Sequence, residues 1–154
     1  MDICALFKPG LNFQDVTNNN VYKRMFIIED DPDVRNKIEK SFKNTALKTF
    51  CAQDYQTALR LIYPRFENAS KFQYAIIDDK FPEKRGEETK FLADKITEEL
   101  IKEHPKIRIF GYFEEERNNE SNKYISILRK GHISLDELYE IIITDAEKEK
   151  EIAL

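Results

Sequence analysis

The chain has 154 residues, of which 41% are hydrophobic and 35% charged, a balance typical of one folded domain. Its formal net charge of −4 provides no basic surface for nucleic acid, and its apolar runs are too short for a membrane-spanning helix or a secretory signal. The two cysteines, Cys4 and Cys51, have no metal-binding or redox spacing, which favours a reduced, cytoplasmic protein without nucleic-acid or membrane partners.

The first half of the chain predicts two strand–helix units behind an amino-terminal segment. Residues 1–23 contain turn signals but no clear periodicity, so we interpret them as an appendage of unknown role. Residues 24–28 carry a continuous apolar run, which predicts a strand covered on both faces. Asp31 is placed to cap a helix that begins with a proline. A strand over 47–52 and a helix capped by Asp54 follow.

The middle of the chain predicts the central strand and a long helix. Residues 73–77 form the strand, and the helix is expected to run from after Gly86 to about His104. Phe91 is expected on the buried side of this helix. Neither His104 nor His132 has a partner at a ligand spacing, so we expect both histidines at the solvated surface.

The last part of the chain predicts strands over 107–110 and 124–128, separated by a polar, acidic loop. A capping box that starts at Ser134 opens the final helix, and a charged, frayed tail is expected over 146–154. Strands alternating with helices predict an α/β domain over 24–145. We expect a single doubly wound, five-stranded parallel sheet, flavodoxin-like in its strand order 2-1-3-4-5, with helices on both faces.

Charged side chains follow three of the expected strands. Glu29 and Asp30 follow the first strand, Asp78 the third, and Lys130 the fifth. Ligands of open parallel sheets bind beyond the carboxyl ends of the strands, where the strand order reverses, so we expect these side chains to lie close together. Clustered carboxylates repel one another unless a cation joins them, and ligation by oxygen alone suits Mg²⁺. The sequence therefore predicts a magnesium site at this edge.

The same residues resemble the receiver domain of two-component response regulators. The resemblance covers residues 24 to about 145. Its motifs are the paired acids after the first strand, Asp78 with Pro82 and Gly86 behind it, and Lys130 after the fifth strand. Together and in this order they form a specific pattern, whereas the Asp–Pro–Gly spacing alone is only moderately specific.

This resemblance implies that Asp78 accepts a phosphoryl group from a sensor histidine kinase or a phosphotransfer protein. Lys130 would pair with the phosphoryl oxygens. Mg²⁺ would be held by Glu29, Asp30, Asp78 and the backbone carbonyl of Lys80. The output would be an interaction with an unknown downstream protein, and a homodimer stays open. Enzymatic activity would be limited to self-phosphorylation and self-dephosphorylation at Asp78.

Several positions depart from the family pattern. The serine or threonine after the fourth strand falls on Gly111, which we expect to leave space over Asp78, and the aromatic residue of the fifth strand falls on Ile127. Asp79 stands where an apolar residue is expected, and we interpret it as solvated. Tyr112 could serve as a mobile aromatic, although a packed strand-end tyrosine is the commoner arrangement. The phosphorylation site is therefore kept, while the usual route out of it is altered.

Two other functions stay open. A degenerate receiver would act as a protein-interaction module that does not switch, which Gly111 and Ile127 favour and the intact Asp78 and Lys130 oppose. A Mg²⁺-dependent phosphatase of the haloacid dehalogenase type also uses a strand-end aspartate. Its signature fails here, because Lys80 occupies the place of the second acid.

Overall fold

The computed structural model describes residues 23–65, 71–119 and 122–152, so the interpretation of residues 1–22 as an appendage lies outside the described residues. The strands are β1 (Lys23–Ile28), β2 (Leu47–Ala52), β3 (Tyr74–Ile77), β4 (Lys80–Pro82), β5 (Thr89–Phe91), β6 (Arg108–Phe113) and β7 (Ser126–Arg129). The helices are α2 (Pro32–Phe42), α3 (Tyr55–Ile62), α4 (Ala93–Glu103) and α5 (Leu135–Ile152).

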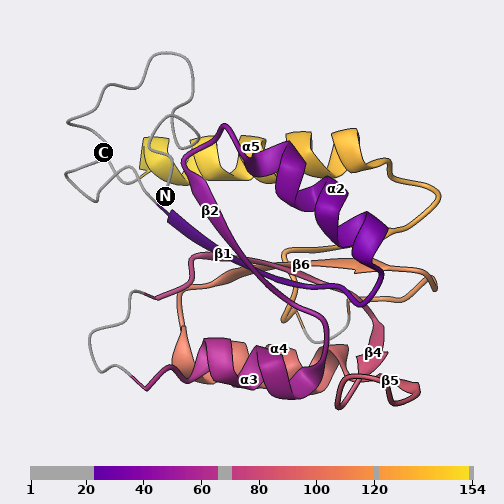
Figure 1. The fold of residues 1–154 in the computed structure, drawn as a ribbon. Coiled ribbons are helices and arrows are strands. Elements are labelled where there is room, and N and C mark those ends of the chain that lie inside the picture. The colour runs from indigo at the N-terminus through magenta and orange to yellow at the C-terminus, as the bar shows by residue number, and fades with distance from the viewer. Residues whose placement is uncertain (1–22, 66–70, 120–121, 153–154) are drawn as a thin grey trace.

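The main sheet has five parallel strands in the order β2-β1-β3-β6-β7. This order confirms the expected doubly wound, flavodoxin-like topology, because β6 and β7 are the fourth and fifth strands of this sheet along the chain. Helices α2 and α5 cover one face of the sheet and α3 and α4 the other (Figure 1). No helix in the described ranges is both long and apolar enough to span a membrane.

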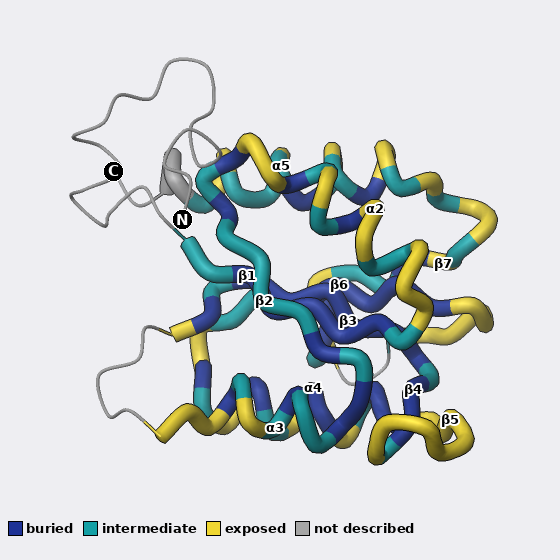
Figure 2. The backbone as a smooth tube through the Cα atoms, viewed as in Figure 1, coloured by how far each residue is buried: buried dark blue, intermediate teal, exposed yellow. Residues whose placement is uncertain are grey.

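The central strands are buried on both faces, as Figure 2 shows by the dark tube of β1, β3 and β6. Alternate side chains of β1 therefore belong to different cores. Phe26 packs in the core beneath α3 and α4, and Ile27 in the core beneath α2 and α5. This two-sided burial explains why the strands read as continuous apolar runs rather than as alternating patterns.

Three of the helices begin where the sequence predicts a cap. The Asp31 side chain accepts hydrogen bonds from the backbone at the start of α2, and Pro32 occupies the first turn. Oδ1 of Asp54 accepts a 2.8 Å hydrogen bond from the backbone N–H of Thr57 in α3. Before α5, Oγ of Ser134 accepts from Glu137 N at 3.1 Å, and Oε1 of Glu137 accepts from Ser134 N at 3.4 Å.

The expectation of a helix directly after Gly86 is wrong for the first residues of that helix. Residues 80–91 instead form an antiparallel hairpin of β4 and β5, and α4 begins only at Ala93. Gly86 has φ +89° in the turn, a conformation that side chains rarely adopt. Phe91, expected in the core, lies on the hairpin with 67% of its surface exposed. Strand pairing between β4 and β5 thus overrides the helical spacing of the local sequence.

Two element ends also differ from expectation by three or more residues. Strand β6 continues to Phe113, three residues beyond the predicted end at residue 110. Helix α5 continues to Ile152, so residues 146–152 of the tail expected to fray are helical. Arg108 of β6 stabilises these last turns through two hydrogen bonds to Asp145, at 2.6 and 2.8 Å, and an ion pair with Glu149.

His104 is buried, with 3% of its surface exposed, so the expectation that it is solvated is wrong. Its Nδ1 accepts a 2.9 Å hydrogen bond from the Phe72 backbone N–H, and its Nε2 lies 3.3 Å from the Ile62 carbonyl oxygen. The imidazole is therefore held in its neutral form with the proton on Nε2. His132 is exposed, as expected.

We expect His104 to make folding stability depend on pH. Burial lowers the pKa of His104 below its ordinary value of 6.5, so the unfolded chain takes up a proton first as the pH falls. The stability that neutral His104 contributes is present above pH 6.5 and is lost below it, by up to about 1.4 kcal/mol per pH unit. Urea unfolding from about pH 7 to about pH 5 would measure this slope.

His104→Gln is the informative variant, because its amide can accept from Phe72 and donate to Ile62 without titrating. Its stability should fall less steeply than that of the wild type over the same pH range. His132→Gln, on the exposed histidine, should keep the wild-type slope. Equal slopes for the wild type and His104→Gln would contradict the assignment.

Candidate functional site

The carboxyl ends of β1 and β3 lie side by side and carry the first acids of the site. The two strands pair in parallel with Ile28 opposite Ile77, so Glu29 and Asp78 follow at the same edge. Asp78 N donates to the Ile28 carbonyl at 3.0 Å, and Arg35 donates to the Glu29 carbonyl at 2.9 Å. These bonds fix both backbones, so the positions of the carboxylates follow from the sheet itself.

Lys130 reaches the same place from the end of β7. Its backbone N–H donates to the Phe113 carbonyl at 2.7 Å. Its ammonium lies 2.9 Å from Oε2 of Glu29 and 2.9 Å from Oδ1 of Asp78. The side chains of Glu29 and Asp78 are 3% and 4% exposed and that of Lys130 is 16% exposed, so the contacts are shielded from water. A single lysine thus bridges two buried carboxylates.

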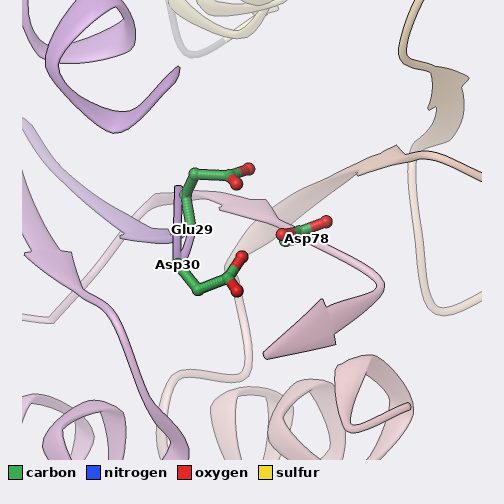
Figure 3. Close-up of side chains that lie close together, drawn as sticks. All are labelled: Glu29, Asp30 and Asp78. Atoms are coloured by element: carbon green, nitrogen blue, oxygen red, sulfur yellow. The ribbon is translucent and has the colours of Figure 1, made fainter. Parts of the chain in front are cut away.

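Asp30 completes an all-oxygen cluster with the two buried acids. One carboxylate oxygen each from Glu29, Asp30 and Asp78 can be chosen so that all lie within 4.8 Å of one another. Figure 3 shows the three carboxylates converging at this edge of the sheet. Asp30 is only half-buried, which leaves an approach from solvent. Hard oxygen donors with access to water fit the preference of Mg²⁺, which usually keeps several waters when bound.

The electrostatics of the cluster call for a cation. Burial raises the pKa of Asp78 to about 9, with a further contribution from the charge of Glu29, while Lys130 opposes the shift. Burial also raises the pKa of Glu29, again against the effect of Lys130. For Lys130 itself, burial favours the neutral form, but the two carboxylates outweigh it and raise its pKa. Added positive charge nearby would favour the ionised forms of both acids.

Asp79 lies next to the site, and its environment differs from the one expected from the sequence. It is buried, with 4% of its surface exposed, so the expectation that it is solvated is wrong. Its backbone N–H donates to Oδ1 of Asp78 at 2.8 Å, and its Oδ2 accepts from Glu115 N at 3.3 Å. The sequence contained a signal for this burial. The family pattern has an apolar residue at this position, and such positions are buried whichever residue occupies them.

Gly111 lies inside β6, not after it, and does not leave free space. A Cβ atom on Gly111 would lie 2.9 Å from two ring carbons of Phe113, the fully buried last residue of the strand. The aromatic ring therefore fills the volume that was expected to be open over Asp78. Ile127 of β7 is the direct pairing partner of Gly111. Neither position offers a hydroxyl group.

Substituting Gly111 should destabilise the fold through this contact. We expect Gly111→Ala to lower the free energy of unfolding by about 1–3 kcal/mol, because a buried ring must shift to admit the new methyl group. Urea denaturation would measure it. Phe113→Leu on the Gly111→Ala background should recover part of the loss by giving up ring volume. If Gly111→Ala is neutral, Phe113 does not occupy this space.

Tyr112 points to the opposite face of the sheet from Gly111 and Phe113. It is 5% exposed, and its hydroxyl donates a 2.8 Å hydrogen bond to the Ile133 carbonyl. The Lys130 ammonium lies 5.8 Å from the centre of its ring. Tyr112 is thus packed, as expected, but it is buried inside β6 rather than packed on the surface at the strand end. Its hydroxyl holds the segment that follows Lys130.

Solved structures share this fold, although no protein-family model and no curated protein matches the chain. A CheY-like response regulator receiver domain protein from Methanospirillum hungatei JF-1 is 20% identical with a TM-score of 0.64, over 84% of this chain and 98% of its own. The signal receiver domain of a putative Luxo repressor protein from Vibrio parahaemolyticus is 16% identical with a TM-score of 0.65, over 86% and 95%.

A third structure is a complex with ligands. It is a response regulator protein from Thermotoga maritima in complex with Mg(2+)-BeF, 18% identical with a TM-score of 0.59, over 79% of this chain and 97% of its own. The chain therefore has the fold of CheY-like receiver domains.

Proposed function

We propose that the chain is a signalling receiver in which Asp78 accepts a phosphoryl group from a phosphohistidine of a sensor histidine kinase or phosphotransfer protein. The observation that carries the proposal is the cluster at the sheet edge: three carboxylates converge within 4.8 Å, and Lys130 lies 2.9 Å from two of them. Mg²⁺ would be held by Glu29, Asp30, Asp78 and the backbone carbonyl of Lys80. The output would be a protein–protein interaction.

The chemistry requires this charge arrangement. A carboxylate oxygen of Asp78 attacks phosphorus, an O–P bond forms, and the P–N bond of the phosphohistidine breaks with its electron pair left on the imidazole. The attack brings an anion toward a phosphoryl group that is itself negative, so neutralisation of the developing charge is the main catalytic demand. Mg²⁺ supplies part of that positive charge when bound. Lys130 supplies the rest, moving from its contact with Asp78 to the phosphoryl oxygens.

The fold supports the proposal independently of the cluster. Structures that share it are response regulator receiver domains, and the one from Thermotoga maritima was solved with Mg(2+)-BeF. Beryllofluoride resembles a phosphoryl group in size and charge. The same ligand is therefore the natural probe for Asp78.

We expect the protein to incorporate one phosphoryl group when incubated with Mg²⁺ and a small acyl-phosphate donor, measured as intact mass. Asp78→Asn should abolish the incorporation, because an amide oxygen is too poor a nucleophile. Asp136→Asn, an exposed acid in the first turn of α5, is the matched control and should be modified like the wild type. A wild-type protein that neither gains this mass nor binds beryllofluoride, seen as a bound ¹⁹F signal, would be a non-switching interaction module. Steady turnover of a simple phosphate ester would indicate a phosphatase instead.

A further inference from the structure

One buried carboxylate, that of Asp79, and an exposed ion pair between Lys80 and Glu115 at 3.3 Å tie the loop after β6 to the site. Oδ2 of Asp79 accepts a hydrogen bond from the backbone N–H of Glu115 at 3.3 Å. Its other oxygen, Oδ1, is buried and has no hydrogen-bond partner among the residues that the structure describes. A buried carboxylate with one long hydrogen bond and no cation is poorly compensated. Its hold on Glu115 is therefore easily upset by a change of charge nearby.

The change of charge would come from Asp78, the residue that precedes Asp79. The backbone N–H of Asp79 already donates to Oδ1 of Asp78 at 2.8 Å, so the two acids share one short stretch of backbone. The Asp79 side chain is also among the groups that raise the pKa of Asp78, after burial and the charge of Glu29. A phosphoryl group on Asp78 would bring nearly two negative charges and only acceptor oxygens. It offers Asp79 nothing to bind and repels it.

The far end of the same loop is held to α4. Arg117 forms an ion pair with Asp94 in the first turn of α4. The Tyr124 hydroxyl donates to Oδ1 of Asp94 at 2.9 Å, and Thr97 Oγ1 donates to the Tyr124 hydroxyl at 3.3 Å. Residues 114–119 thus run from Asp79 at the site to Asp94 at the start of α4, which Arg117 and Tyr124 both contact. Movement at Glu115 can therefore be transmitted to the start of α4.

We propose that Asp79 holds the loop of residues 114–119 against the site in the unphosphorylated protein and that a phosphoryl group on Asp78 releases it. This inference rests on the proposed function of Asp78. A side-chain hydroxyl at the end of β6 would draw the loop toward the phosphoryl group, but Phe113, the last residue of the strand, supplies none. Repulsion of Asp79 gives the opposite movement, outward. The signal then leaves through the loop and the start of α4 rather than through β7.

The test compares three forms of the full chain by amide exchange with water, measured by NMR with Mg²⁺ alone and with Mg²⁺ plus beryllofluoride. In the wild type, exchange at Glu115 should accelerate severalfold when beryllofluoride binds. Asp79→Asn can still accept from Glu115 but carries no charge, so its exchange should not respond. Asp79→Leu has no acceptor, so Glu115 should exchange fast in both conditions. The amide of Ile125, bonded to the Ile109 carbonyl at 2.7 Å, serves as the internal reference.

The outcomes separate this inference from the proposed function. A bound ¹⁹F signal with unchanged exchange at Glu115 in the wild type overturns the release but leaves the phosphorylation proposal standing. Acceleration in Asp79→Asn equal to that of the wild type shows that charge on Asp79 is not the cause and overturns it too. If the Glu115 amide of Asp79→Leu exchanges as slowly as that of the wild type, Asp79 does not hold the loop. That result overturns the inference whatever binds at Asp78. Failure of the wild type both to bind beryllofluoride and to gain the phosphoryl mass overturns both proposals.

Discussion

Replacing Lys130 with methionine should destabilise the metal-free protein by about 3 kcal/mol. The side chain keeps its length but loses the ammonium that bridges Glu29 and Asp78 at 2.9 Å each. Removing one member of a buried ion cluster leaves its partners uncompensated, which is strongly destabilising. The loss of stability should lie at the low end of the range that is usual for a broken buried ion pair, because the carboxyl groups of Glu29 and Asp78 can take up protons. Guanidinium unfolding at neutral pH would measure it.

Lys71→Met is the matched control for this change. Lys71 also bonds a carboxylate, Glu103 at 3.1 Å, but both side chains are solvent-exposed, so the loss should be below about 1 kcal/mol. Mg²⁺ should stabilise Lys130→Met more than the wild type, since the cation then meets two carboxylates without competition. If the two lysine variants are equally stable, Lys130 does not neutralise the cluster.

The affinity of the protein for Mg²⁺ should rise with pH, by up to about tenfold per pH unit between neutrality and pH 9, and then level off. The physical reason is the Asp78 carboxyl, whose pKa burial raises to about 9 and which must lose its proton to bind a metal. The same shift sets the sign for stability. The stability that protonated Asp78 contributes is fully present below its ordinary pKa of 3.8. It is lost progressively as the pH rises toward about 9, so the metal-free protein weakens over this interval.

Calorimetric titration with Mg²⁺ at several pH values would measure both the affinity and the proton released. Asp78→Asn should bind Mg²⁺ more weakly and lose most of the pH dependence, because its amide does not titrate. Asp136→Asn, at the start of α5, should behave as the wild type. A wild-type affinity that is constant across this range would contradict the assignment of Asp78 as a ligand.

The order of the five strands of the main sheet and of the helices between them could be predicted from the sequence, as could the members of the cluster. Helix caps such as Asp31 and Asp54 act on backbone groups within three residues, so they can be read from local sequence. The cluster could be predicted for a different reason. Parallel strands align their carboxyl ends, so acids that directly follow two neighbouring strands must meet. Glu29 and Asp78 accordingly lie together, and Lys130 reaches both of them from the end of β7, as expected.

The surroundings of the site residues, in contrast, depended on tertiary packing. Phe91 lies on a hairpin because β4 pairs with β5, and His104 is buried because the backbone of Phe72, distant in sequence, needs an acceptor. Phe113 fills the space beside Gly111, and Asp79 is covered by the loop of Glu115. Each case depends on a segment that arrives from elsewhere in the chain. Local spacing fixes which side chains an element presents, but burial and hydrogen-bond partners are fixed by what packs against it.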